Sequence, residues 1–209
     1  MGQQAMFVRL SRCNLRCPGC DTPYTWDTTR FDLREQTSTM AVEDLVAALL
    51  VKPPRLVVVT GGEPLLQQPA VTALAAALSA AGRRVEVETN GTVAPDAHLL
   101  AVVDRFNVSP KLSTFAAAGD APIRPVALDV LVRSGKAVFK FVVSGPEGLT
   151  EIGRLEETFG LTPIWVMPAG TTSDAVTDGL RSVAEQTLER GWNLTGRLHV
   201  LLWGDQRGR

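Results

Sequence analysis

The chain has 209 residues, about the length of one domain, and 45% of them are hydrophobic, which excludes a disordered or low-complexity chain. Lys and Arg number 21 against 22 Asp and Glu, so the formal net charge of -1 gives no field that would draw the chain to nucleic acid or to anionic lipid. No apolar run reaches the ~18 residues of a membrane span, and the first residues lack the pattern of a signal peptide. We therefore expect a cytoplasmic protein whose main partner is a small molecule.

Short apolar, β-branched runs alternate with longer segments of helical periodicity along the chain. The runs predicted to be strands are residues 6–10, 56–60, 85–89, 106–109, 138–143, 164–167 and 198–203. The predicted helices between them are residues 42–51, 68–81, 97–103, 147–159 and 174–190, with a weaker helix over 124–133, where Pro125 interrupts the start. Most of the strand runs are apolar throughout, as strands of a buried parallel sheet are. This alternation predicts βα units and the α/β class.

The number of predicted strands narrows the architecture. A closed (β/α)8 barrel needs one strand more and has about 250 residues, so we expect a shortened, partial parallel (β/α) barrel. A flat doubly wound sheet is the alternative, and both folds place their chemistry at the carboxyl ends of the strands. No linker or internal repeat divides residues 1–209, which predicts a single domain. The irregular stretch at about 11–39, mostly a loop over 18–39, has the length of a functional loop.

All three cysteines of the chain, Cys13, Cys17 and Cys20, form a CxxxCxxC motif directly after the first predicted strand. Soft thiolate ligands suit zinc or an iron–sulfur cluster. A structural zinc site needs a fourth ligand, for which His98 and His199 are the soft candidates, and neither lies in a Cys/His pair. Three thiolates leave one iron of a [4Fe–4S] cluster open to bind a cofactor. We therefore predict an iron–sulfur cluster, with zinc or three small buried hydrophobic residues as the alternatives.

A second motif, Thr60-Gly61-Gly62-Glu63-Pro64, follows the second predicted strand. Gly61 and Gly62 have no side chain, so the backbone at this strand end can approach a ligand closely. Alone, the motif is also typical of a turn that ends a strand. A CxxxCxxC loop followed by this motif resembles the radical S-adenosylmethionine (SAM) superfamily, whose members bind SAM at the open iron.

Further segments extend the resemblance over nearly the whole chain, to the 7-carboxy-7-deazaguanine synthase family. They are FVRL (7–10), CNLRC (13–17), CDT (20–22), EVETNGT (86–92), NVSPKL (107–112) and LHVLLWG (198–204). The resemblance implies a radical SAM lyase that contracts the ring of 6-carboxy-5,6,7,8-tetrahydropterin to 7-carboxy-7-deazaguanine with loss of ammonia, in deazapurine biosynthesis of the queuosine type. It also implies a [4Fe–4S] cluster, SAM as a regenerated cofactor, Mg²⁺, a flavodoxin or ferredoxin reductant and a homodimer.

The resemblance also implies roles for particular residues around the cofactors. The cluster ligands are Cys13, Cys17 and Cys20, and Thr22 supplies a hard oxygen ligand to Mg²⁺, although an ordinary loop threonine is the alternative. A hydroxyl and an ammonium at Ser109 and Lys111 suit the methionine carboxylate of SAM. The remaining implied SAM contacts are Gly19, Cys20, Asp21, Gly62, Glu88 toward the ribose, Pro110, Met167, Pro168, Ala169 and Gly170.

Three residues are implied for the substrate. Arg9 and Thr60 lie on the first two predicted strands, and a guanidinium holds a carboxylate bidentately, the alternative for Arg9 being a solvent-facing position. Arg209 would contribute a terminal carboxylate, unless the terminus is frayed. The family has a Gln-Gly-Glu-Gly segment before the position of Phe7, where this chain has Gly-Gln-Gln-Ala-Met. We interpret these residues as the interior of that loop after a start placed too late, the alternative being a functionally altered relative. The alternatives for function are a glycyl-radical activase or a metal-binding module without catalysis.

Overall fold

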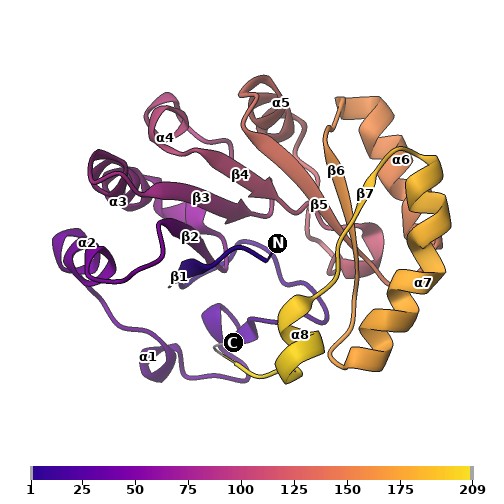
Figure 1. The fold of residues 1–209 in the computed structure, drawn as a ribbon, viewed down its shortest axis with the longest axis horizontal. Coiled ribbons are helices and arrows are strands. Elements are labelled where there is room, and N and C mark those ends of the chain that lie inside the picture. The colour runs from indigo at the N-terminus through magenta and orange to yellow at the C-terminus, as the bar shows by residue number, and fades with distance from the viewer. Residues whose placement is uncertain (1, 208–209) are drawn as a thin grey trace.

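The structure is a computed structural model that describes residues 2–207. Its centre is a seven-stranded sheet in which all strands are parallel and lie in chain order, β1 to β7 (Figure 1). The strands are β1 (Ala5–Leu10), β2 (Leu56–Gly61), β3 (Arg84–Thr89), β4 (Arg105–Val108), β5 (Ala137–Val143), β6 (Ile164–Pro168) and β7 (Asn193–Leu194). The strand order never reverses, so the sheet is not doubly wound. Within residues 2–207, β1 and β7 are edge strands that pair on one side only and not with each other, which confirms the partial barrel.

Most helices connect successive strands and cover the outer face of the curved sheet, whereas the first helix lies in the loop after β1 and the last one follows β7, both on the opposite side (Figure 1). They are α1 (Leu33–Gln36), α2 (Val42–Leu50), α3 (Gln68–Ala80), α4 (Ala97–Val102), α5 (Pro125–Arg133), α6 (Glu147–Phe159), α7 (Ser173–Glu189) and α8 (Leu198–Trp203), with 3-10 turns η1 (Pro23–Thr25), η2 (Pro64–Gln67) and η3 (Ser113–Phe115). Pro125 begins α5 rather than interrupting it, because the first helical position needs no N–H donor. None of the helices in residues 2–207 has the length and hydropathy of a membrane span.

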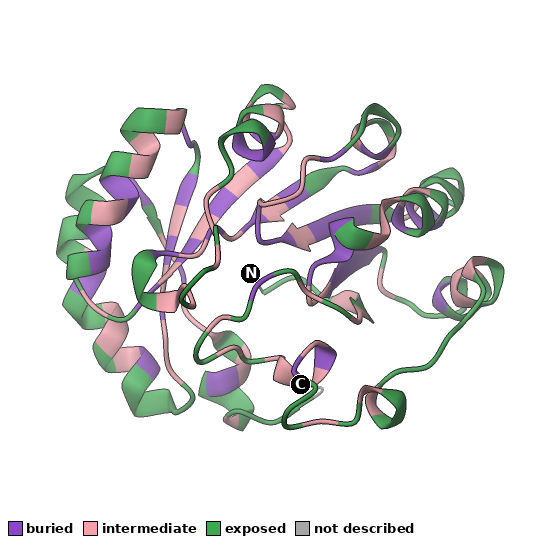
Figure 2. Ribbon diagram, turned by 180° about the vertical axis from the view of Figure 1, so that it is seen from behind, coloured by how far each residue is buried: buried purple, intermediate pink, exposed green. Residues whose placement is uncertain are grey.

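The two faces of the sheet differ in polarity. Residues such as Val59, Val87 and Phe141 are fully buried against the helices, and Figure 2 shows buried positions concentrated in the strands and on the helix faces that meet them. The alternating residues point to the concave side, where Glu88 and Lys140 are half-buried. The hydrophobic core thus lies between sheet and helices, and the concave side is left for polar chemistry.

The prediction of a strand over 198–203 is wrong, because these residues form α8. The seventh strand is instead the two-residue β7, which pairs with β6. A short, continuously apolar run has no periodicity, so the sequence alone does not distinguish a buried strand from a short helix over residues 198–203. The helix buries Val200 and ends at Gly204, which takes a positive φ of 69°. The loop over 18–39 also contains η1 and α1.

Candidate functional site

The cysteine loop leaves the carboxyl end of β1 and packs against the Gly-Gly turn that follows β2. The Gly62 N–H donates to Leu10 O at 3.0 Å, and the Glu63 N–H donates to Arg12 O at 2.8 Å. A Cβ added at Gly62 would lie 2.0 Å from Arg12 O and 2.9 Å from the Cβ of Cys13. Glycine is therefore required here by the close approach of two backbones. Arg12 itself has a φ of 74°, an unusual strain for a non-glycine residue directly before Cys13.

The three cysteines are free thiols, each half-buried. Burial raises the pKa of the Cys13 thiol to about 11, opposed by a hydrogen bond from the Leu15 backbone. Burial also raises the pKa of Cys17, although the Lys111 ammonium lowers it. Cys17 and Cys20 also raise the pKa of Cys13, and binding of a metal cluster to these thiols would release their protons.

The donor set fits an iron–sulfur cluster better than a single ion. Among residues 2–207, no three His, Cys, Asp or Glu side chains form a group that would hold one metal ion. A [4Fe–4S] cluster does not need such a group, because each thiolate ligates a different iron. Neutral N–H donors lie near two of the sulfurs: the Trp26 indole donates to Cys20 Sγ at 3.4 Å, and Asn90 Nδ2 lies 4.0 Å from Cys13 Sγ.

Glu63 connects the ends of β2 and β3 from a fully buried position. Its carboxylate accepts hydrogen bonds from Leu65 N, Thr89 Oγ1 and Asn90 N, at 2.9, 2.8 and 2.7 Å. Burial raises the pKa of Glu63, while the three donors lower it. Asn90 continues the network to the cysteine loop by donating to Asn14 Oδ1 at 3.0 Å. The Gly-Gly-Glu-Pro motif and the turn after β3 therefore hold the cysteine loop in place.

The predicted substrate and ribose residues form a polar row on the concave face. Arg9 on β1 is in register with Thr60 on β2. Thr60 Oγ1 donates to Glu88 Oε2 on β3 at 2.9 Å, and Glu88 Oε1 lies 3.5 Å from Lys140 Nζ on β5. Asn107 on β4, in register with Glu88, adds an amide to the same face. Residues from five strands thus offer charges and hydrogen bonds to one volume.

Ser109 and Lys111 are brought together after β4, because Lys111 Nζ donates to Ser109 Oγ at 2.9 Å. Burial lowers the pKa of Lys111, and the nearby Cys17 and Asp21 raise it. The Lys111 ammonium is therefore held by Ser109 within electrostatic reach of the cysteine loop. Pro110, between them in sequence, is buried.

The remaining predicted SAM residues lie on two segments, the cysteine loop and the end of β6. Gly19 and Asp21 are exposed on the cysteine loop, and Gly19 has a φ of 70°. Residues 167–170 lie at the end of β6 and contact β5 and α7, where the Ala169 N–H donates to Val143 O at 2.8 Å. Thr22 Oγ1 lies 3.7 Å from Cys20 Sγ. Arg209 is outside the described residues.

Arg197, before α8, reaches back to the cysteine loop. Its Nη2 donates to Asp21 Oδ2 at 3.1 Å, while its Nε is buried with no hydrogen-bond partner in residues 2–207. Burial lowers the pKa of the neighbouring His199, and the Arg197 charge lowers it further. The segment directly before α8 therefore contacts the cysteine loop next to Cys20.

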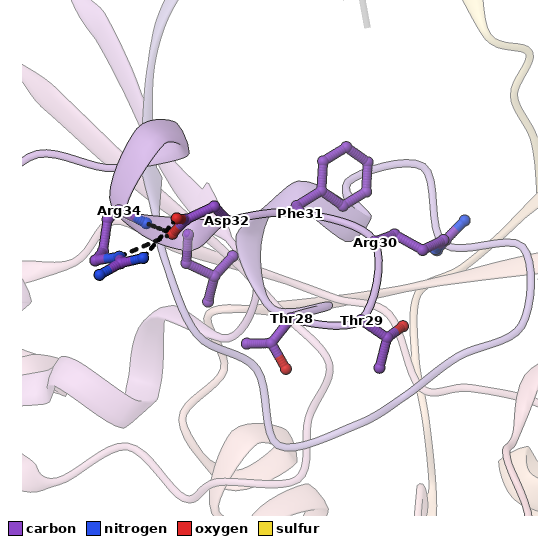
Figure 3. Close-up of a pocket in the computed structure, with 7 residues that line it drawn as sticks. Thr28, Thr29, Arg30, Phe31, Asp32 and Arg34 are labelled. Carbon is purple, nitrogen blue, oxygen red and sulfur yellow. Dashed lines mark hydrogen bonds and ion pairs between the residues drawn. The ribbon is translucent and has the colours of Figure 1, made fainter.

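A hollow of about 600 Å³ lies in the later part of the loop that follows β1 (Figure 3). It is lined by the consecutive residues 28–34, and Arg34 on its rim is paired with Asp32 at 2.8 Å. None of the predicted site residues lines it. The arrangement of sulfurs, charges and strand ends, not this hollow, identifies the site.

Sequence reasoning missed Trp26, Asn90, Lys140 and Arg197. Asn90 lies in the segment 86–92, which resembles the family, so that motif could have identified it as a site residue. Lys140 interrupts an apolar strand and was the next best signal. Trp26 and Arg197 carry no local pattern, because their partners Cys20 and Asp21 are defined by the folded loop.

Comparisons with known proteins agree with this geometry. Residues 8–115 match the model of the radical SAM superfamily. The chain is 39% identical to the 7-carboxy-7-deazaguanine synthase of Pyrobaculum aerophilum, over 100% of this chain and 90% of the relative. The chain belongs to the 7-carboxy-7-deazaguanine synthase family. Another member, from Halobacterium salinarum, is 36% identical over 98% of this chain and 84% of its own length.

The fold is shared more widely within the superfamily. Streptococcus suis SuiB, solved with bound S-adenosylmethionine, superposes with a TM-score of 0.65 at 13% identity, over 94% of this chain. This chain spans 51% of the SuiB chain, and at that identity the likeness concerns the fold alone. Membership of the radical SAM superfamily gives the chain a [4Fe–4S] cluster and SAM as cofactors.

Proposed function

We propose that the protein is a 7-carboxy-7-deazaguanine synthase. It would convert 6-carboxy-5,6,7,8-tetrahydropterin to 7-carboxy-7-deazaguanine with release of ammonia, in deazapurine biosynthesis of the queuosine type. The observation that carries the proposal is the 39% identity to the Pyrobaculum aerophilum enzyme over the whole chain. The polar row from Arg9 to Lys140 supports it, since a carboxylated, nitrogen-rich bicycle needs charged and hydrogen-bonding partners.

Cys13, Cys17 and Cys20 would ligate the cluster, which with SAM supplies the radical chemistry when bound. Lys111 and Ser109 would hold the methionine carboxylate, and Glu88 would accept from the ribose hydroxyls. The backbone near Gly62 would line the SAM site, together with residues 19–21 and 167–170. Their joint task is to fix one reacting C–H bond near SAM and to exclude water.

Arg9 and Thr60 would bind the substrate, Arg9 through its carboxylate. Thr22 would ligate Mg²⁺, which takes hard oxygen ligands and keeps waters for exchange with substrate oxygens. The exposure of Arg9 leaves its guanidinium accessible for this role. In the same proposal, Arg209 would contact the substrate through its terminal carboxylate.

The protein would act as a single domain, supported by the one continuous sheet, and as a homodimer in the cytoplasm. It would receive its electron from a flavodoxin or ferredoxin. These parts of the proposal follow from the family and are tested separately from the reaction.

The test is an anaerobic assay of the reconstituted protein with dithionite, SAM, Mg²⁺ and the carboxytetrahydropterin, followed by mass spectrometry. We expect 7-carboxy-7-deazaguanine and ammonia in equal amounts. R9M is expected to lower kcat/KM at least tenfold while SAM still binds, and R181M, an exposed arginine on α7, serves as the matched control. SAM cleavage without this product would contradict the assigned substrate, and intact cluster without SAM cleavage would contradict radical chemistry.

A further inference from the structure

One cysteine of the loop receives a hydrogen bond from an aromatic side chain. The Trp26 indole Nε1–H donates to Cys20 Sγ at 3.4 Å. The amide nearest to Cys13, Asn90 Nδ2, lies farther from its sulfur, at 4.0 Å, and also serves Asn14. Trp26 is half-buried, so this contact is partly shielded from water. The three sulfurs are therefore unequal, and Cys20 has the shortest N–H contact from a side chain.

The turn that carries Trp26 is held firmly against the end of β1. The Trp26 N–H donates to Pro23 O at 3.1 Å, and the buried Thr25 donates through Oγ1 to Thr22 O at 2.8 Å. The carbonyl of Thr25 accepts from the Arg12 N–H at 2.7 Å, beside Cys13. The indole is thus positioned by a turn anchored to the same loop as the cysteines.

We propose that Trp26 sets the reduction potential of the cluster by donating its indole N–H to the sulfur of Cys20. Reduction adds one electron to the cluster, and part of the added negative charge resides on the cysteine sulfurs. A hydrogen bond stabilises the more negative state more strongly, so it raises the potential. The proton stays on the indole nitrogen throughout, and the electron comes from a low-potential one-electron donor.

The inference deepens the proposed function, since it requires the cluster at Cys13, Cys17 and Cys20. Trp26 is a positioning residue here, because it acts on the metal centre through Cys20. Its consequence is that the cluster accepts an electron from its donor more readily than it would without the indole.

The experiment is an anaerobic potentiometric titration of the reconstituted protein, followed by EPR of the reduced cluster. The variant W26F removes the N–H and keeps an aromatic ring. We expect W26F to have a more negative reduction potential than wild type. At the same applied potential its ratio of reduced to oxidised cluster should be roughly tenfold smaller, which corresponds to a shift of ~59 mV for one electron. The control is W192F, because Trp192 also donates its indole N–H, to Glu156 at 3.0 Å, on α6 away from the cysteine loop.

A second measurement uses the wild-type protein labelled with 15N-tryptophan. Pulsed EPR of the reduced cluster should show a 15N coupling, which W26F loses and W192F retains. Equal potentials for wild type and W26F at equal iron content would overturn the inference. If W26F fails to hold a cluster, the wild-type coupling decides: its presence supports the inference and its absence overturns it. A wild-type protein that binds no iron would overturn the proposed function as well, and iron analysis identifies that case.

Discussion

Individual side chains stabilise the cysteine loop through local ion pairs and hydrogen bonds. Asp27 is an example: it is 8% exposed and accepts from Thr29 N and Oγ1 and from Arg30 Nε. The Thr29 hydroxyl first, and then Arg30, lower the pKa of Asp27 to about 2. A carboxylate with so many local donors fixes the turn just after Trp26.

We predict that D27N loosens this loop in a pH-dependent way. Because the folded pKa lies below the ordinary value of 3.8, the stabilisation is present above about pH 4 and disappears as the pH falls toward 2. Hydrogen exchange of residues 23–31 in the apoprotein should therefore be faster in D27N at pH 6, with the difference narrowing at lower pH. D178N, on the exposed face of α7, is the control. A difference that stays constant down to pH 3 would contradict the role of the carboxylate charge.

At the scale of elements, the site depends on how closely neighbouring strand ends approach each other. The β2 turn meets the cysteine loop backbone to backbone at Gly62, and Glu63 joins the same turn to β3. Arg197, directly before α8, adds a contact from the far end of the chain by donating to Asp21. The loop is thus held from both its sheet side and its exposed side.

We expect G62A to impair cluster assembly, because the added Cβ would lie 2.0 Å from Arg12 O and push the cysteine loop away. Iron content and the cluster absorbance after reconstitution should fall several-fold. The control G82A changes a turn glycine with a φ of 72° and no atom within 4 Å of the added Cβ, so it tests backbone strain without a clash. Equal iron content in G62A and wild type would show that the close approach is not required.

For the whole molecule, stability and function occupy opposite faces of the sheet. The core between sheet and helices is apolar, whereas the concave face carries the polar row that includes Thr60 and Glu88. Burial of apolar side chains therefore stabilises the barrel without help from the site residues. The site can then carry charges that contribute little to folding.

We predict that L78A destabilises the apoprotein strongly and L188A only slightly. Leu78 on α3 is fully buried in the core, and its truncation should lower the free energy of unfolding by about 2–5 kcal/mol. Leu188 on α7 is 66% exposed, so its truncation should change the free energy of unfolding by less than about 0.5 kcal/mol. Urea denaturation of the apoprotein measures both, and similar losses for the two variants would place the core elsewhere.

The sequence by itself determined the βα repetition, the cysteine motif and most strand positions, because these depend on residue patterns that act over a few neighbours. The buried alternation of β5, with Phe139 and Phe141 inward toward the helices, follows from the period of a strand. The motifs Gly61-Gly62 and Ser109 to Lys111 were recognisable for the same reason, since each is continuous in the chain.

The tertiary structure decided what depends on distant segments. It made residues 198–203 a helix and gave the edge of the sheet to Asn193–Leu194. It also brought Lys140 to Glu88, and Arg197 to Asp21, across 52 and 176 residues of sequence. Such contacts depend on sheet register and loop closure, which no local pattern encodes. The open concave face exists for the same reason: the sheet curves but leaves β1 and β7 apart.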